Sequence, residues 1–125
     1  MAQEDREVLE LLKSELSFVR DGAYGRSPHA PGRASQIFED SPTCLNFGDS
    51  SRPAPCSSCV LVQFVPQERR EESAPCRFIP LGSQGETVDH YSRYGTQAEV
   101  EDALQAWLGQ EISRIEAELA SQPIA

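Results

Sequence analysis

The placement of four cysteines is the feature that most restricts how this chain can fold. Three of them, Cys44, Cys56 and Cys59, lie in a segment rich in proline and serine, and Cys76 follows the next apolar run. The spacing is C-x11-C-x2-C-x16-C. A C-x2-C turn brings two sulfurs to one metal ion at about 2.3 Å, and two further cysteines complete a tetrahedral site. The pattern therefore predicts that Cys44, Cys56, Cys59 and Cys76 bind a metal.

Zinc is the expected ion, because soft thiolates favour zinc or iron–sulfur clusters over hard cations. Four protein ligands close the coordination shell, which is typical of a structural site. Three alternatives stay open: an iron–sulfur cluster, four cysteines buried as small apolar side chains, and a redox pair of Cys56 and Cys59. A thioredoxin-like C-x2-C opens a helix, whereas here Pro55 precedes the motif and a strand is predicted after it. His29 or His90 could replace one cysteine, although neither has a typical ligand spacing.

Amphipathic helices are predicted at both ends of the chain. Residues 4–21 carry apolar side chains at spacings of three and four, and Gly22 marks a stop. Thr96 to Glu99 reads TQAE, which fits a capping box. The apolar stripe that follows comprises Val100, Leu104, Trp107, Leu108, Ile115 and Leu119. A helix over residues 97–120 would be about 36 Å long and would outrun strands of about 17–20 Å. We therefore expect its far end to pack on the N-terminal helix, with weak homodimerisation through the helices as the alternative.

Short apolar runs between these helices predict a small β-sheet. The best strand candidate is CVLVQFV at 59–65, followed by CRFIPL at 76–81 and by shorter runs at 37–38 and 43–47. Cys76 returns to the Cys59 end of the sheet only if the two main strands are parallel. Residues 82–95 are expected to form turns or loops. The sequence thus predicts one α+β domain over residues 1–125, in which amphipathic N- and C-terminal helices flank a small sheet with a four-cysteine metal-binding loop.

Composition narrows the classes of partner. The net charge is −9, which argues against nonspecific binding to nucleic acid or to an anionic membrane surface, since both require a positive patch. No apolar run approaches the roughly 20 residues of a membrane span. The N-terminus has Glu4, Asp5 and Glu7 where a secretion signal would be basic and then apolar. We therefore expect a cytoplasmic protein in which thiols stay reduced.

Five stretches resemble a group of small, uncharacterised bacterial proteins with four cysteines: YGRSPHAP, FEDSPTCLNF, PCSSCVLVQFVP, PCRFIPL and GETVD, followed by the C-terminal helix. The resemblance implies a bacterial origin and brings no activity, substrate or cofactor. The chain has neither a G-x-S-x-G elbow nor a phosphate-binding glycine loop, so an enzyme is less expected than a binding protein. We predict a metal-stabilised interaction or regulatory module, with a protein partner or a second copy bound through the helices. The alternative is an iron–sulfur or thiol-based redox protein.

Overall fold

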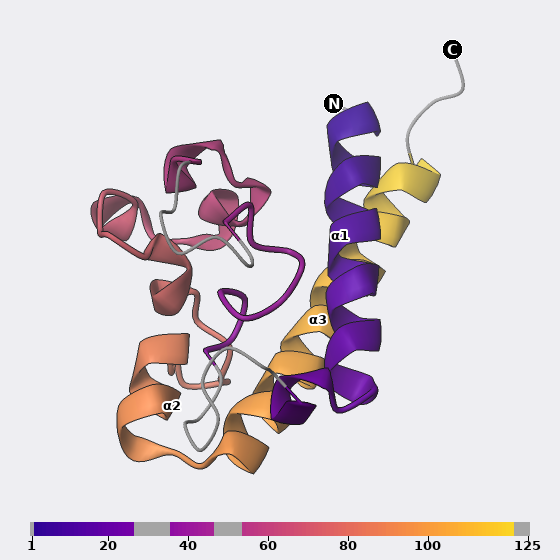
Figure 1. Ribbon diagram of the computed structural model, residues 1–125. Helices are drawn as coiled ribbons and strands as arrows, with labels where there is room; N and C mark the ends of the chain where they lie inside the picture. Colours follow the sequence, from indigo (N-terminus) through magenta and orange to yellow (C-terminus); the bar gives the residue numbers. More distant parts are fainter. Residues whose placement is uncertain (1, 27–35, 47–53, 122–125) are drawn as a thin grey trace.

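The computed structural model describes residues 2–26, 36–46 and 54–121, and these residues form helices and turns (Figure 1). The α-helices within them are α1 (Ala2–Arg20), α2 (Val88–Tyr94) and α3 (Gln97–Ser121). Short 3-10 helices occupy the middle of the chain: η1 (Ala23–Arg26), η2 (Cys56–Ser58), η3 (Val60–Phe64), η4 (Gln67–Arg69) and η5 (Pro75–Phe78). The predicted α+β class is therefore wrong, because no strand or sheet occurs in these three ranges.

Helix α1 follows the predicted amphipathic pattern. Val8, Leu12, Glu15 and Val19 are buried at spacings of four, three and four, so they share one face of the helix. Gly22 ends the helix with a φ of 73°, and its amide donates to the Val19 carbonyl over 3.1 Å. Glycine adopts this left-handed conformation without a Cβ clash. The predicted helix and its stop are both confirmed.

Helix α3 begins with the predicted capping box. The Thr96 amide donates to the Glu99 carboxylate over 2.8 Å, and the Glu99 amide donates to the Thr96 hydroxyl over 3.1 Å. These two bonds satisfy donors that have no partner within the first helical turn. The apolar stripe is buried from Val100 to Ile115, and Leu119 is half-buried against the core.

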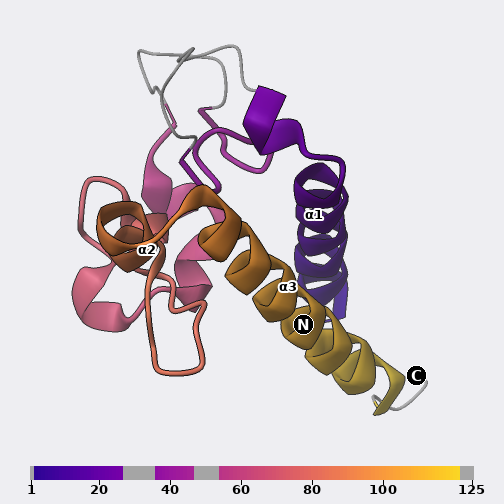
Figure 2. The same cartoon turned by 90° about the horizontal axis from the view of Figure 1, so that it is seen from below.

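Helices α1 and α3 run antiparallel and side by side, as both views show (Figures 1 and 2). Lys13 and Glu116 form an ion pair across them at 3.2 Å. Ile112 and Ile115, near the far end of α3, are buried in the same apolar cluster as Leu9 and Leu12 of α1. The prediction that α1 covers this end of α3 within one chain is confirmed.

The apolar run at 59–65 forms the 3-10 helix η3 instead of a strand. The Val62 amide donates to the Cys59 carbonyl over 3.1 Å, and the Val65 amide donates to the Val62 carbonyl over 3.0 Å. A strand needs a neighbour to satisfy its backbone, whereas a 3-10 turn bonds within itself. Leu61 within η3 and Val65, which follows its last residue in an extended conformation, are both buried.

The other strand candidates are also wrong within the described residues. The second apolar run forms η5 and then a single antiparallel bridge from Pro80 to Thr87. Residues 37–38 and 43–46 lie in turns, with Phe38 at a φ of 67°, and residue 47 falls outside the described ranges. The predicted parallel crossover to Cys76 fails for the same reason.

Helix α2 lies within residues that were predicted to be turn or loop. Its start has a recognisable signal: the Thr87 hydroxyl accepts from the His90 amide over 3.0 Å, and Asp89 lies in the first turn. Such a cap favours a helix at its N-terminus. Gly95 follows its last residue. Gly82, Gly85 and Gly95 favour turns, and on that ground residues 82–95 were predicted to form turns or loops.

Aromatic side chains join the helical pair to the middle segment, which comprises residues 36–46 and 54–81. The Trp107 ring of α3 meets Phe64 of η3 edge-on, with centroids 5.1 Å apart, and Phe38 at 6.2 Å. Phe38 is fully buried. These contacts seat the middle segment, with its cysteines, on α3. Among the described residues, no helix is both long and apolar enough to cross a membrane.

Candidate functional site

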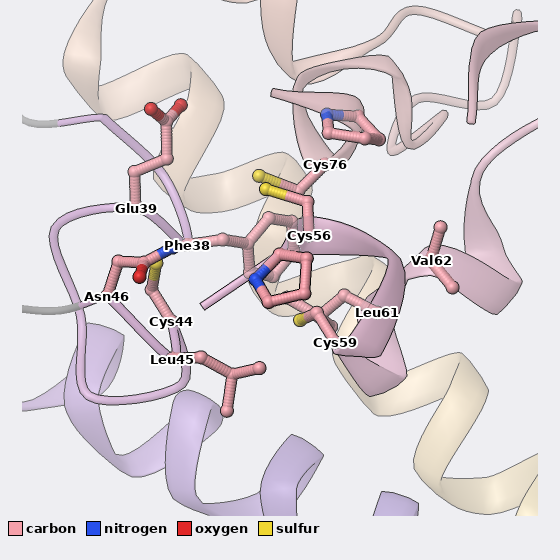
Figure 3. A pocket seen from close by; sticks show the side chains of 12 residues that line it. Phe38, Glu39, Cys44, Leu45, Asn46, Cys56, Cys59, Leu61, Val62 and Cys76 are labelled. Atoms are coloured by element: carbon pink, nitrogen blue, oxygen red, sulfur yellow. The ribbon is translucent and has the colours of Figure 1, made fainter. Parts of the chain in front are cut away.

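All four cysteines line one small pocket in the middle segment (Figure 3). Cys44 lies in the segment 36–46, Cys56 begins η2, Cys59 separates η2 from η3, and Cys76 lies in η5. In this view the thiols surround the Phe38 ring. The pocket has a volume of about 30 Å³, and a cavity needs about 10–15 Å³ to hold one water molecule. It has room for a single ion and is far below the roughly 300 Å³ at which small-molecule pockets begin.

The two central cysteines are presented by a local turn. The Cys59 amide donates to the Cys56 carbonyl over 3.0 Å, and the Ser58 amide donates to the Pro55 carbonyl over 3.0 Å. This is the compact C-x2-C turn that the spacing suggests. The Cys56 thiol also lies 3.8 Å from the Ser73 carbonyl, which ties η2 to the segment leading into η5.

Asn46 brings the Cys44 segment to the Cys56 segment. Its side-chain amide donates to the Ala54 carbonyl over 2.9 Å, and its side-chain oxygen accepts from the Ala54 amide over 2.8 Å. Cys44 precedes Asn46 by two residues, and Cys56 follows Ala54 by two. The paired bonds therefore bring the segments that carry Cys44 and Cys56 together at the pocket.

A bidentate ion pair joins the same segment to η5. The Arg77 guanidinium donates to the two carboxylate oxygens of Glu39 over 2.7 and 3.1 Å. The Glu39 side chain is 11% exposed, and that of Arg77 is 42% exposed. Glu39 lines the cysteine pocket, and Arg77 follows Cys76. The pair thus fixes Cys44 and Cys76 relative to each other with the directional geometry that a guanidinium provides.

Glu15 anchors the Cys44 segment to α1. Its side chain is fully buried and accepts hydrogen bonds from Tyr24, from the Ser41 hydroxyl at 2.7 Å and from the Thr43 hydroxyl at 3.1 Å. The Phe38 amide in turn donates to the Tyr24 hydroxyl over 2.8 Å. This buried group was not predicted from the sequence. The available signal was its position in the apolar stripe of α1, where a carboxylate needs buried partners.

Burial and mutual repulsion disfavour thiolates in this pocket. Burial is the main cause that raises the pKa of Cys76, and the charge of Glu39 and the neighbouring thiols raise it further. Burial also raises the pKa of Cys59, with Cys44 and Cys56 adding to it and a backbone hydrogen bond from Leu61 opposing it. The four thiols are therefore close enough to influence one another electrostatically.

The pocket is not arranged as a ready coordination sphere. Across residues 2–26, 36–46 and 54–121, no group of three or more His, Cys, Asp or Glu side chains is placed so that it could hold a metal ion. All four cysteines are present as thiols. His90 lies on α2, where its ring contacts Tyr94 at 5.2 Å, and it does not line the pocket. His29 falls outside the described residues.

Comparisons with known protein families, with curated proteins and with solved structures find no match to this chain.

Proposed function

We propose that Cys44, Cys56, Cys59 and Cys76 bind one zinc ion, and that the chain is a metal-stabilised interaction or regulatory module. The observation that carries the proposal is that four thiols line one pocket of about 30 Å³. They come from three segments: 36–46, the Cys56–Cys59 turn and η5. A pocket of this size accommodates one ion. Its other lining residues are mainly apolar, so the sulfurs are the soft donors available to an ion there.

Zinc would serve the fold in a region that has little regular structure. Residues 54–81 contain 3-10 helices of three to five residues, which bond poorly and rarely extend further. One ion held by four cysteines would join η2, η3 and η5 to the segment 36–46. Structural zinc supplies folding free energy in just this way, because the unfolded chain has no preformed site.

Binding requires the sulfurs to move closer together than they stand in the described structure. Zinc–sulfur bonds are about 2.3 Å long in a tetrahedral site. Three of the cysteines lie in or beside short 3-10 turns, and rotation about their χ1 bonds is the simplest movement that would bring the sulfurs together. The Asn46 and Glu39–Arg77 contacts would keep the backbone in place during this rearrangement.

A closed four-thiolate site leaves no coordination position for water or substrate. We therefore assign the metal a structural role and assign the chain a role in binding other molecules. Such a module would lose its binding surface when the metal is removed, because the segment 36–46 carries both Cys44 and the residues that contact α1.

The deciding experiment measures the metal content of protein purified under reducing conditions without added metal. We expect a colourless protein with about one zinc per chain and four sulfur neighbours at about 2.3 Å by X-ray absorption. Cys76→Ser should lose zinc and unfold more readily, whereas Ser58→Ala, at an exposed position in the same region, should keep both properties. Wild-type protein without bound metal would refute the proposal. Visible absorption with iron and sulfide would instead place the chain among iron–sulfur proteins.

A further inference from the structure

A groove on the other side of the segment 36–46 is separate from the cysteine pocket. It lies between α1 and Pro42–Thr43 and has a volume of about 310 Å³. Its lining residues are Glu10, Leu11, Ser14, Phe18, Pro42 and Thr43. Leu11 and Phe18 are only half-buried and pack against the edge of the core. The groove therefore presents two apolar side chains that the fold does not fully cover.

The two apolar side chains have the spacing of a helix-binding surface. Leu11 and Phe18 are seven residues apart, which is two turns of α1 and about 10.5 Å along its axis. A partner helix that lies along α1 would reach both with apolar side chains at positions i and i+7. The Phe18 ring packs edge-on against the buried Tyr24, with centroids 4.9 Å apart, at the far end of the groove.

The exposed face of α1 carries both basic and acidic side chains. Arg6, Lys13 and Arg20 recur every seven residues and therefore follow one line along the helix. Lys13 pairs with Glu116 of α3 at 3.2 Å, so this line lies on the flank next to α3. At 100° per residue, Glu7 lies on the other flank with Leu11 and Phe18. Glu10 lies between the two flanks, opposite the buried face, and lines the groove. Both are exposed, and the rim of the groove that α1 forms is therefore acidic.

We infer that this groove binds a basic amphipathic helix of a partner protein, through two apolar side chains at i and i+7 flanked by lysine or arginine. The net charge of −9 would attract such a helix. A second copy of this chain fits poorly, because α3 carries six carboxylates against Arg114 alone. The inference names the class of partner for the proposed interaction module, and it rests on that proposal for its biological role only.

The test uses a fluorescent 15-residue helix-forming peptide of alanine and arginine with leucine at positions four and eleven. We expect the wild-type protein to bind it in a salt-dependent way, as measured by anisotropy. Glu10→Lys should weaken binding by about tenfold or more, because it places a cation on the acidic rim. Asp102→Lys makes the same change of net charge at an exposed position on α3, and it should change affinity by less than about twofold. Phe18→Ser should also weaken binding, while Trp107 fluorescence reports that the variant is folded.

Equal weakening by Glu10→Lys and Asp102→Lys would show attraction to net charge alone and would overturn the inference. Absence of binding, or self-association of the wild-type protein that Glu10→Lys abolishes, would overturn it as well. Zinc content is measured on the same samples. Bound zinc without peptide binding would refute the peptide-binding inference and leave the metal proposal intact. Peptide binding without bound zinc would refute the metal proposal and leave the peptide-binding inference intact.

Discussion

Glu15 offers the most direct test of how the middle segment is held on the helical pair. Its carboxylate accepts three hydrogen bonds from side chains that lie 9, 26 and 28 residues away. A buried hydrogen bond contributes about 0.5–1.5 kcal/mol net, so three contribute about 1.5–4.5 kcal/mol. Two effects reduce this sum. Removal of the carboxylate relieves its burial, and one of the Ser41 and Thr43 hydroxyls, which lie 2.6 Å apart, is then free to donate its proton to the other. We expect Glu15→Ala to lower the free energy of unfolding by about 2–3 kcal/mol.

The assay is urea denaturation followed by the fluorescence of Trp107, the single tryptophan of the chain. Glu10→Ala is the matched control, because it removes the same side chain from an exposed position of the same helix. It should change the free energy of unfolding by no more than about 0.5 kcal/mol. If Glu15→Ala is no more destabilising than this control, the Glu15 cluster does not anchor the segment and the reasoning is refuted.

Glu15 also makes a signed prediction for pH. Burial raises the pKa of Glu15 above its ordinary value of 4.5, and the hydrogen bonds from Tyr24, Ser41 and Thr43 only partly oppose this. The folded state then holds the proton more tightly than the unfolded state. The resulting stabilisation is complete below the unfolded pKa and is lost as pH rises through the raised value. Glu15→Gln does not titrate, so it should gain stability relative to the wild type as pH rises from about 4 to about 8. A difference that stays constant, or that moves the other way, would contradict this.

Two further predictions concern the helical pair and the asparagine clamp. Ile115 is only 3% exposed, so Ile115→Glu together with Leu119→Glu should lower the free energy of unfolding by about 3 kcal/mol or more and leave the solution mass unchanged. Light scattering and thermal melts measure these two properties. Conversion of a dimer into an equally stable monomer would show that this stripe is an oligomer interface. Asn46→Ala removes both bonds to Ala54 and should cost about 1–2 kcal/mol and weaken zinc binding in a chelator competition; unchanged zinc affinity would mean that the clamp does not position Cys44.

The ends of the chain could be predicted from sequence because their structure is local. The stripe from Val8 to Val19, the Gly22 stop and the Thr96–Glu99 capping box each depend on residues within one or two turns. Intrahelical hydrogen bonds satisfy the backbone whatever lies nearby. The antiparallel pairing then follows, because a short chain offers few other surfaces that could cover two apolar stripes.

The middle of the chain depended on tertiary context. CVLVQFV has strand-forming residues, but a strand is stable only with a neighbour to bond, and the described residues offer it none. The same run folds as η3, whose backbone amides bond within the turn, and both Leu61 and Val65 are buried. Strand propensity largely expresses such surroundings and not an intrinsic backbone preference.

The candidate site likewise combines local features, which the sequence predicts, with long-range contacts, which it does not. Spacing alone identified the four cysteines and the Cys56–Cys59 turn, because a C-x2-C turn is local. The sequence could not identify Glu15, Asn46 or the Glu39–Arg77 pair, whose bonds connect residues 8 to 38 positions apart. Such polar contacts form only after apolar burial has brought the segments together, because each contact must replace the hydrogen bonds to water that its groups lose. Sequence therefore indicated the four thiols of the proposed metal site, and tertiary structure decided how they are held at one pocket.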